Sequence, residues 1–314
     1  MQSLDNNTQA FLALVRAGLW EQDVRLLPHQ DIEWREIYRL ATEQSVLGLV
    51  VDGLEHSEVK PPQVLLLQWI GKLQQIEQRN KAMNAFIAES IGTLREQDIY
   101  ALLVKGQGVA QCYEKPLWRP SGDIDYFLSK DDYGKAVAFF KNKYSNNKDG
   151  GRYSQEYVFY TDQWMIEVHG SLRTCLSSKI DKVVDTVQKS VFYGGNVRPW
   201  DNNGTLVFLP APNEDVFLVF THFIKHFYKE GMSLRQVCDW CRLLWTYRES
   251  QNYGKLEFWI NKAGLMKEWQ AFAALAVKYL GMPAEAMPFF NLNDNLNKKA
   301  EKLMEFILGG YSNN

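Results

Sequence analysis

Strand-like runs of apolar residues are confined to the middle third of this chain, and this confinement constrains its fold more than any other feature. On either side, apolar residues recur at helical spacing, most clearly over residues 63–97, a long amphipathic stretch without proline. The chain has no internal repeat, low-complexity segment or flexible linker. The sequence therefore predicts an α+β fold, in which a small mixed sheet is flanked by N- and C-terminal helical regions that pack with it into one body.

The predicted elements follow from hydrophobic periodicity and from glycine, proline and asparagine turns. We expect an N-terminal helical region over residues 1–97, a sheet-containing core over 98–210 and a C-terminal helical region over 211–314. Within the core, we expect strands over 99–104, 124–128, 153–160 and 164–169, weaker strands over 191–193, 197–200 and 205–209, helices over 107–113 and 131–144, and a polar turn over 145–151. Beyond the core, we expect helices over 213–228, 234–247, 258–263, 268–280 and 296–308.

Composition excludes several classes of protein. The chain has 314 residues, 46% of them hydrophobic, which is enough for a well-buried core and by length alone suggests about two domains. Its 35 Lys and Arg residues nearly balance its 37 Asp and Glu residues, and the net charge of -2 excludes a strongly basic nucleic-acid coat. The apolar content excludes a mostly disordered chain, and four cysteines do not make a disulfide scaffold.

The sequence also predicts neither a membrane span nor a secretory signal. The longest apolar runs, such as residues 46–51 and 216–220, are far shorter than the roughly 20 residues that a bilayer requires. The N-terminus is polar and lacks a basic segment followed by an apolar run. We therefore expect a soluble cytoplasmic protein with reduced cysteines.

Two carboxylates two residues apart, Asp123 and Asp125, are the most informative feature of the core. On a strand this spacing directs both side chains to one face, while Ile124 points into the core. Two like charges this close repel each other unless a cation lies between them, and Mg²⁺ prefers such oxygen ligands. Paired metal ions can activate an attacking oxygen and stabilise a leaving one. The pair therefore indicates a divalent-metal site for phosphate chemistry.

A third acid and several phosphate-binding candidates accompany this pair. Alternation of apolar and polar residues places Glu167 and His169 on one strand face, and Glu167 joins the carboxylates if its strand lies beside theirs. Upstream, Gly106 lets the chain turn sharply from a strand into a helix, where backbone N–H groups can bind phosphate oxygens. Lys105 and Arg119 supply positive charge for a triphosphate, although each could instead pair with an acid.

The ordered set resembles the DNA polymerase beta-like nucleotidyltransferase superfamily, which has a strand ending in glycine, a short helix, an Asp-x-Asp strand and a later acidic strand. More narrowly, it is similar to a family of uncharacterised bacterial nucleotidyltransferases. The chain departs from the superfamily where Gln107 stands directly after the turn glycine, in place of the common Gly or Ser. The resemblance spans about residues 104–240, and the matching positions are 104–106, Tyr113, Pro116, 119–120, 122–125, 166–169, 209–212, His222, His226, 234–235 and Asp239.

This resemblance implies transfer of a nucleoside monophosphate from an NTP to an acceptor, with release of pyrophosphate and with Mg²⁺ or Mn²⁺ as cofactor. It implies that Asp123, Asp125 and Glu167 hold the metal ions and act in catalysis. The residues implied in nucleotide binding are Lys105, Gly106, Gln107, Arg119 and Gly122. The residues expected to border the cleft are His169, His222, His226, Arg235 and Asp239.

Other interpretations of the carboxylates and of the histidines stay open at this point. Asp123 and Asp125 could be solvated acids of the turn before them. His222 and His226 could form a Cys₂His₂ zinc site with Cys238 and Cys241, if the two helices face each other. We favour small core residues for the cysteines, because they lie among apolar neighbours on a helix.

Two further expectations concern the surroundings of the acids. Arg235 and Asp239 are four residues apart on a predicted helix, and we expect them to form an ion pair. Trp118 or Tyr126 could stack on a nucleotide base.

The near-neutral net charge gives no support to a long nucleic-acid acceptor, so we favour a small molecule with a hydroxyl group, such as a sugar or phosphosugar; a protein acceptor stays open. One rival interpretation is a non-catalytic nucleotide-binding or protein-interaction module that retains the fold. A second rival is a phosphohydrolase that uses the same acids.

Overall fold

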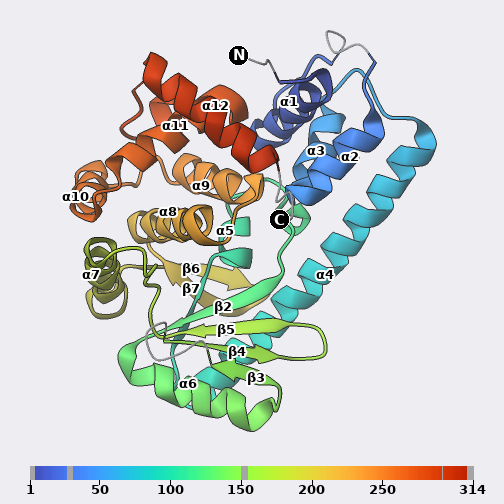
Figure 1. Cartoon of the computed structure of the whole chain (residues 1–314). Coiled ribbons are helices and arrows are strands. Elements are labelled where there is room, and N and C mark those ends of the chain that lie inside the picture. Colours follow the sequence, from blue (N-terminus) through green and yellow to red (C-terminus); the bar gives the residue numbers. More distant parts are fainter. Residues whose placement is uncertain (1–3, 27–30, 150–154, 292, 310–314) are drawn as a thin grey trace.

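The structure is a computed structural model that describes residues 4–26, 31–149, 155–291 and 293–309. Most helices from the two ends of the chain lie together on one side of a small sheet, whereas α6 (Lys130–Lys143) and the C-terminal half of the long helix α4 (Gln63–Glu96) pack on its other side (Figure 1). The N-terminal helices are α1 (Asn6–Trp20), α2 (Trp34–Glu43), α3 (Leu47–Glu55) and α4. The C-terminal helices are α8 (Pro212–Lys229), α9 (Leu234–Thr246), α10 (Tyr253–Ala263), α11 (Met266–Leu280) and α12 (Asp294–Leu308).

Within the described residues, five strands form a mixed sheet in the order β1–β2–β5–β4–β3. β2 and β5 are parallel, and the other neighbouring strands are antiparallel. The fold is α+β with a small mixed sheet flanked by helices, as predicted. The strands of this sheet are β1 (Ala101–Val104), β2 (Asp123–Leu128), β3 (Asn147–Asp149), β4 (Glu156–Tyr160) and β5 (Met165–His169).

Alternation along β2 separates an apolar face from the face that carries the acids. Ile124 and Tyr126 are buried in a hydrophobic cluster with the C-terminal half of α4 and with α6. Asp123 and Asp125 occupy the opposite face, because successive side chains of a strand point to opposite sides. Burial of the apolar face stabilises the sheet by roughly 25 cal/mol per Å², and this burial determines which face presents the acids.

A second, two-stranded sheet follows the core. β6 (Val197–Asn202) and β7 (Thr205–Pro210) pair as an antiparallel hairpin, as the two weaker strand candidates predicted. Residues of β7 join the same hydrophobic cluster as β1 and α4. The helix α5 (Gly106–Ala110) ends three residues before the predicted end, and a short 3₁₀ turn (Pro116–Trp118) follows it.

Two predictions about the core were wrong. The predicted strand over 191–193 is the last turn of α7 (Ser178–Gly194), a helix whose buried side chains include Val184, Val187 and Val191. The Ser177 side chain caps its N-terminus, and Gly195 ends it with a φ of 66°. The helix was missed because its valines favour strands intrinsically, whereas their three- and four-residue spacing is helical.

We predicted only a polar turn over residues 145–151, but this segment contains β3. Pairing with β4 holds these residues in a strand conformation. Pairing with an existing sheet edge can order a polar segment that has no strand pattern of its own. Residues 150–154, which include the predicted start of the strand over 153–160, lie outside the described residues.

The chain ends share one hydrophobic cluster. Side chains from α1, α3, α8, α9 and α11 are buried in it together, and Trp20 Nε1 donates a hydrogen bond to the carbonyl of Leu280 at 2.6 Å. The predicted boundaries at 97/98 and 210/211 fall between α4 and β1 and between β7 and α8, and the division into three parts remains a prediction. Among the described helices, none has the length and apolar character needed to cross a membrane.

Gly48 of α3 packs closely against the segment that leads into the site. A Cβ atom at residue 48 would lie 2.2 Å from the carbonyl oxygen of Trp118. We expect Gly48→Ala to lower the free energy of unfolding by about 1–3 kcal/mol through overpacking. The matched control, Gly71→Ala on α4, adds a Cβ with nothing within 4 Å and should raise this free energy by up to ~1 kcal/mol. Urea unfolding measures both, and equal responses would contradict the close packing.

Candidate active site

The parallel pairing of β2 with β5 brings the acids together. Asp125 is the register partner of Glu167, and Asp123 lies two residues earlier on the same face of β2. His169 Nε2 is 2.8 Å from Asp125 Oδ1 and 3.3 Å from Glu167 Oε2. Ligand atoms of Asp125, Glu167 and His169 all lie within 4.8 Å of one another, a spacing that could hold a metal ion. β5 thus lies beside β2, which is the condition under which Glu167 joins the carboxylates.

Lys105 places an ammonium group among these acids. Its Nζ atom is 2.6 Å from Asp125 Oδ1, and its side chain is 17% exposed. The backbone at Lys105 has a φ of 57°, and Gly106 follows with a φ of 38°. A left-handed conformation of this kind costs a residue other than glycine on the order of 1–3 kcal/mol. The sharp turn from β1 into α5 is therefore a strained feature beside the acids, as is common at functional sites.

The charges of the cluster shift one another's pKa values. Burial by itself raises the pKa of Asp125, but Lys105 and the hydrogen bond from His169 outweigh it and hold that pKa far below its usual range. The charge of Asp125, followed by burial, raises the pKa of Asp123. Burial raises the pKa of Glu167, whereas for His169 the hydrogen bonds to the acids outweigh burial and raise the pKa. Asp123 and Glu167 thus lack a full counter-charge, and an added cation would stabilise them.

The acids line a cleft between the sheet and α8, and this cleft has two halves. The half beside the strained turn, called here the turn-side pocket, has a volume of about 150 Å³ and is lined by residues that include Gly106, Arg119, Ser121, Asp125 and Arg235. The half beside β5, called the strand-side pocket, has a volume of about 360 Å³ and is lined by residues that include Glu156, Glu167, His169, Arg173 and Lys225. Both halves are lined by Lys105, Asp123, His222 and His226.

The turn-side pocket contains buried polar atoms that lack a partner in the described part of the chain. These atoms are Ser121 Oγ and Arg235 Nε. Arg235 Nη1 donates a hydrogen bond to the carbonyl of Pro120 at 3.0 Å. Unpaired buried donors are costly, and a bound anion would satisfy them. Ser121 was not predicted from the sequence, although its position in a Pro-Ser-Gly turn directly before Asp123 is a signal that could have identified it.

The carboxylate of Asp239, on α9, forms an ion pair with Arg119. Nε and Nη2 of Arg119 donate to the two Asp239 carboxylate oxygens at 2.8 and 2.6 Å, and the Tyr113 hydroxyl donates to Asp239 Oδ1 at 2.7 Å. The predicted i,i+4 ion pair of Arg235 with Asp239 is therefore wrong, because a bidentate arginine and a hydroxyl already use this carboxylate. Arg119 lines the turn-side pocket with its charge balanced, whereas Arg235 lines the same pocket without a paired acid in the described structure.

Two predicted nucleotide-binding residues lie outside the cleft lining. Gln107 is buried, and its Nε2 donates to Asn80 Oδ1 of α4 at 2.8 Å, so this side chain anchors α5 to α4. Gly122 lines neither half of the cleft. A residue that the sequence did not suggest, Glu156 of β4, lines the strand-side pocket and lies 3.7 Å from His169 Nδ1. It carries no local sequence signal, because pairing of β4 with β5 places it there.

The two aromatic residues considered for base stacking also lie elsewhere. The Tyr126 hydroxyl pairs with Ser90 of α4, on the sheet face opposite the acids. Trp118 donates its Nε1–H to Glu77 Oε2 of α4 at 3.1 Å and lines neither half of the cleft. Neither ring therefore lines the cleft, which argues against the suggestion that Trp118 or Tyr126 stacks on a nucleotide base.

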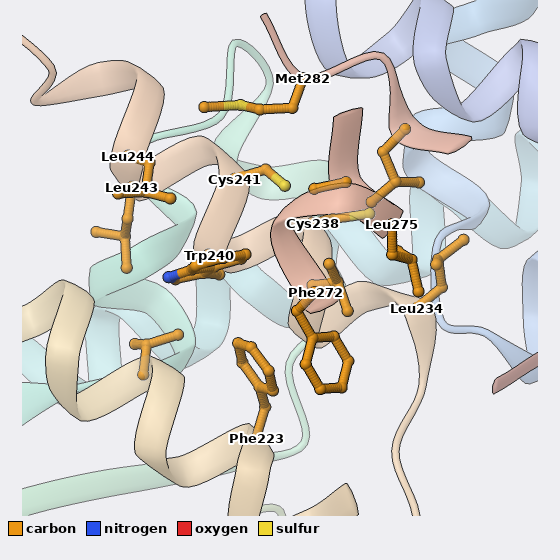
Figure 2. Close-up of a cluster of buried hydrophobic side chains, with 14 of the residues drawn as sticks. Phe223, Leu234, Cys238, Trp240, Cys241, Leu243, Leu244, Phe272, Leu275 and Met282 are labelled. Carbon is orange, nitrogen blue, oxygen red and sulfur yellow. The ribbon is translucent and has the colours of Figure 1, made fainter. Parts of the chain in front are cut away.

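The histidines and the cysteines do not form a common metal site. His222 and His226 line the cleft on α8, whereas Cys238 and Cys241 lie in a cluster of hydrophobic side chains that includes Trp240 (Figure 2). In the part of the chain that the structure describes, no group of potential metal ligands joins these cysteines to the histidines. The interpretation of the cysteines as buried core residues is confirmed.

One other group of ligand atoms occurs in the described residues, formed by Glu21, Asp52 and His56 of the N-terminal region. Lys115 Nζ lies 2.5 Å from Asp52 Oδ1 and already supplies a positive charge there. The pocket beside Asp52 has a volume of only about 20 Å³, too small for a nucleotide. The acids of β2 and β5 are therefore the candidate centre.

The structure thus brings together the paired carboxylates, the third acid and the strand-to-helix turn on which the resemblance to nucleotidyltransferases rests. The family described as "uncharacterised nucleotidyltransferase" matches residues 30–281, and the chain belongs to this family. The match confirms the resemblance that the sequence indicated, and its span includes every predicted site residue. Neither the curated proteins nor the solved structures contain a match to the chain.

The two aspartates of β2 should respond oppositely to neutralisation in protein treated with EDTA. Asp123→Asn removes repulsion from Asp125 and should raise the free energy of unfolding by about 0.5–2 kcal/mol at pH 7. Asp125→Asn removes the buried carboxylate that pairs with Lys105 and should lower it by about 3–5 kcal/mol. Urea unfolding with EDTA present measures both effects.

The pH dependence provides a control for this prediction. A raised carboxyl pKa penalises the fold above that pKa, and the penalty disappears as the pH falls below the pKa of the unfolded chain. The gain from Asp123→Asn should therefore be full at neutral pH and should vanish as the pH falls through the range in which carboxylates titrate. A gain that persists in acid would contradict charge repulsion as its cause.

Proposed function

We propose that this protein transfers a nucleoside monophosphate from an NTP to a hydroxyl group of a small acceptor, with a divalent cation at Asp123, Asp125 and Glu167. The observation that carries the proposal is the register pairing of Asp125 with Glu167 beside the turn at Lys105 and Gly106. The same order of strand, turn, paired acids and third acid underlies the resemblance to DNA polymerase beta-like enzymes.

The residues at the acids fit a hard divalent cation. Asp125 and Glu167 offer oxygen atoms close together, and Asp123 adds a carboxylate whose raised pKa reflects unrelieved repulsion from Asp125. His169 Nε2 donates to Asp125 Oδ1 at 2.8 Å and lies 3.3 Å from Glu167 Oε2, so it helps to orient both carboxylates. Mg²⁺ or Mn²⁺, when bound, would activate the attacking oxygen and neutralise charge on the leaving one.

The turn-side pocket is suited to the polyphosphate of the NTP. Arg235 Nε and Ser121 Oγ are buried and have no hydrogen-bond partner among the described residues, and a phosphate would satisfy both. The Lys105 side chain extends from the turn to Asp125. Its ammonium group can therefore balance the charge of a phosphate while the group remains near the acids. Arg119 holds Asp239 and the turn-side wall in place, so we assign it a supporting role beside the phosphates.

The strand-side pocket is suited to the acceptor or to the nucleoside. Its volume of about 360 Å³ lies in the range of small-molecule sites. Its lining mixes Arg173 and Lys225 with Glu156 and Glu167, and such mixed charge does not favour a long nucleic acid. A small hydroxyl compound therefore fits best, and we place the activity in the cytoplasm, where NTPs are available.

One experiment separates this proposal from its rivals. The protein is incubated with each labelled NTP, Mg²⁺ or Mn²⁺ and a panel of hydroxyl compounds. We expect release of pyrophosphate and a product that carries the NMP. Release of inorganic phosphate would instead support a phosphohydrolase, and nucleotide binding without turnover would support a non-catalytic module.

The carboxylate pair should be required for this transfer. Asp123→Asn with Asp125→Asn removes two proposed metal ligands, and we expect metal-dependent pyrophosphate release to fall to background. Circular dichroism verifies that the double variant is folded. Asp131→Asn, at an exposed acid in the first turn of α6, is the matched control and should keep full activity. Full activity in the double variant would reject the proposed site.

Arg235 should affect binding of the polyphosphate more than binding of the nucleoside. We expect Arg235→Gln to weaken NTP binding roughly tenfold to hundredfold, since a hydrogen bond to a charged group contributes about 1.5–3 kcal/mol. NMP binding should change much less. Isothermal titration with a non-hydrolysable NTP analogue measures these affinities. Arg173→Gln, which changes a cation of the strand-side pocket already paired with Asp185, is the control. Equal losses for NTP and NMP would contradict the assignment.

A further inference from the structure

α8 carries a chain of hydrogen bonds that the proposed transfer does not yet use. His222, His226 and Glu230 follow one another at four-residue spacing, which places them along one helical face. His226 Nδ1 lies 2.8 Å from Glu230 Oε2, and His226 Nε2 lies 3.0 Å from His222 Nε2. The two rings meet edge to face, with centroids 4.4 Å apart.

The donors and acceptors of this chain can be assigned from its outer end. The Glu230 carboxylate can only accept, so His226 donates its Nδ1–H. Burial lowers the pKa of His226 and lowers that of His222 well below its usual value, so both rings are neutral at neutral pH. The Nε2 atom of a neutral His226 then accepts the Nε2–H of His222. This assignment leaves the lone pair of His222 on Nδ1.

The position of His222 makes this lone pair available to a ligand. His222 lines both halves of the cleft, as does Asp123 of the acid cluster. Its Nδ1 atom has no hydrogen-bond partner within the described residues, while its Nε2 is held by His226. The residue that carries this acceptor nitrogen therefore lines the strand-side pocket, in which we place the acceptor.

We propose that His222 accepts the proton of the acceptor hydroxyl, and that His226 and Glu230 are positioning residues that hold it in the required tautomer. The inference rests on the proposed function and identifies the residue that activates the acceptor. Glu167 is less suited to this task, because it is a proposed metal ligand and lies 3.3 Å from His169. A histidine relay ending in a carboxylate stabilises the imidazolium that forms.

The proposed step forms one bond to the α-phosphorus and breaks another. The acceptor oxygen forms a bond to the α-phosphorus, and its proton passes to His222 Nδ1. The bond between the α-phosphorus and the bridging oxygen breaks, and pyrophosphate leaves with the bonding electrons. The positive charge on His222 is stabilised through His226 by the Glu230 carboxylate. The proton then passes to solvent, which restores the neutral ring.

The test measures pyrophosphate release with the NTP that the wild-type protein uses, with water and with glycerol as acceptors. We expect His222→Ala to lower kcat roughly 10²- to 10⁴-fold, the usual contribution of a general base, with little change in NTP affinity. Imidazole in the buffer should restore part of the rate, because it supplies the missing base. Glu230→Gln should lower kcat less. His56→Ala, outside the cleft, is the matched control and should leave the rate unchanged.

The possible outcomes separate a failure of the proposed function from a failure of the histidine relay. If the wild-type protein releases no pyrophosphate with any acceptor, the proposed function fails and this inference fails with it. If the wild-type protein turns over and His222→Ala matches its rate, only the relay is rejected. A slow His222→Ala protein that imidazole does not restore, or that loses NTP affinity equally, also rejects it.

¹⁵N NMR of the histidine rings tests the tautomers without activity, and it covers the case in which His222→Ala does not fold. We expect the hydrogen of His226 on Nδ1 and that of His222 on Nε2 at neutral pH. A hydrogen on His222 Nδ1 overturns the proposal.

Discussion

The parallel register of β2 and β5 is the constraint on which the rest of the site depends. Side chains alternate along each strand, so the apolar residues that enter the cluster with α4 and α6 determine which residues face the cleft. A slip of one residue would turn Asp125 or Glu167 into the core, where an unpaired charge is very costly. Hydrophobic packing on one face of the sheet therefore sets the carboxylate geometry on the other face.

The two aspartates of β2 meet different electrostatic environments, although only one residue separates them. Asp125 is buried between Lys105 and His169, which together hold its pKa far below the usual range. Among the described residues Asp123 forms no such ion pair, and the charge of Asp125 raises its pKa. The two residues therefore differ in role. Asp125 is a buried, ion-paired part of the fold, whereas Asp123 contributes unbalanced negative charge where the two pockets meet.

Local patterns predicted most of the fold and the acid cluster. The strand β2, the hairpin of β4 with β5 and the long helix α4 all follow from periodicity and turn residues, which act over a few positions. α7 was missed because its valines have strand propensity, which its amphipathic packing overrides.

The remaining errors involve contacts between distant segments. Asp239 pairs with Arg119 rather than with Arg235, although the latter is only four residues away. Glu156 enters the cleft through the pairing of β4 with β5, which no local pattern specifies. Spacing along one helix or strand thus predicts which residues can meet, whereas the fold decides which of them do.

The hydrophobic cluster shared by the chain ends limits how the sheet can be used in isolation. Leu102, Val104 and Phe127 of the sheet are buried in it beside residues of α1 and α11. A fragment restricted to residues 98–210 would expose this apolar surface to water and would lose the wall formed by α8. Truncations and fusions of this protein therefore need to retain the helices of both ends, since the sheet-containing core cannot be excised as an independent module.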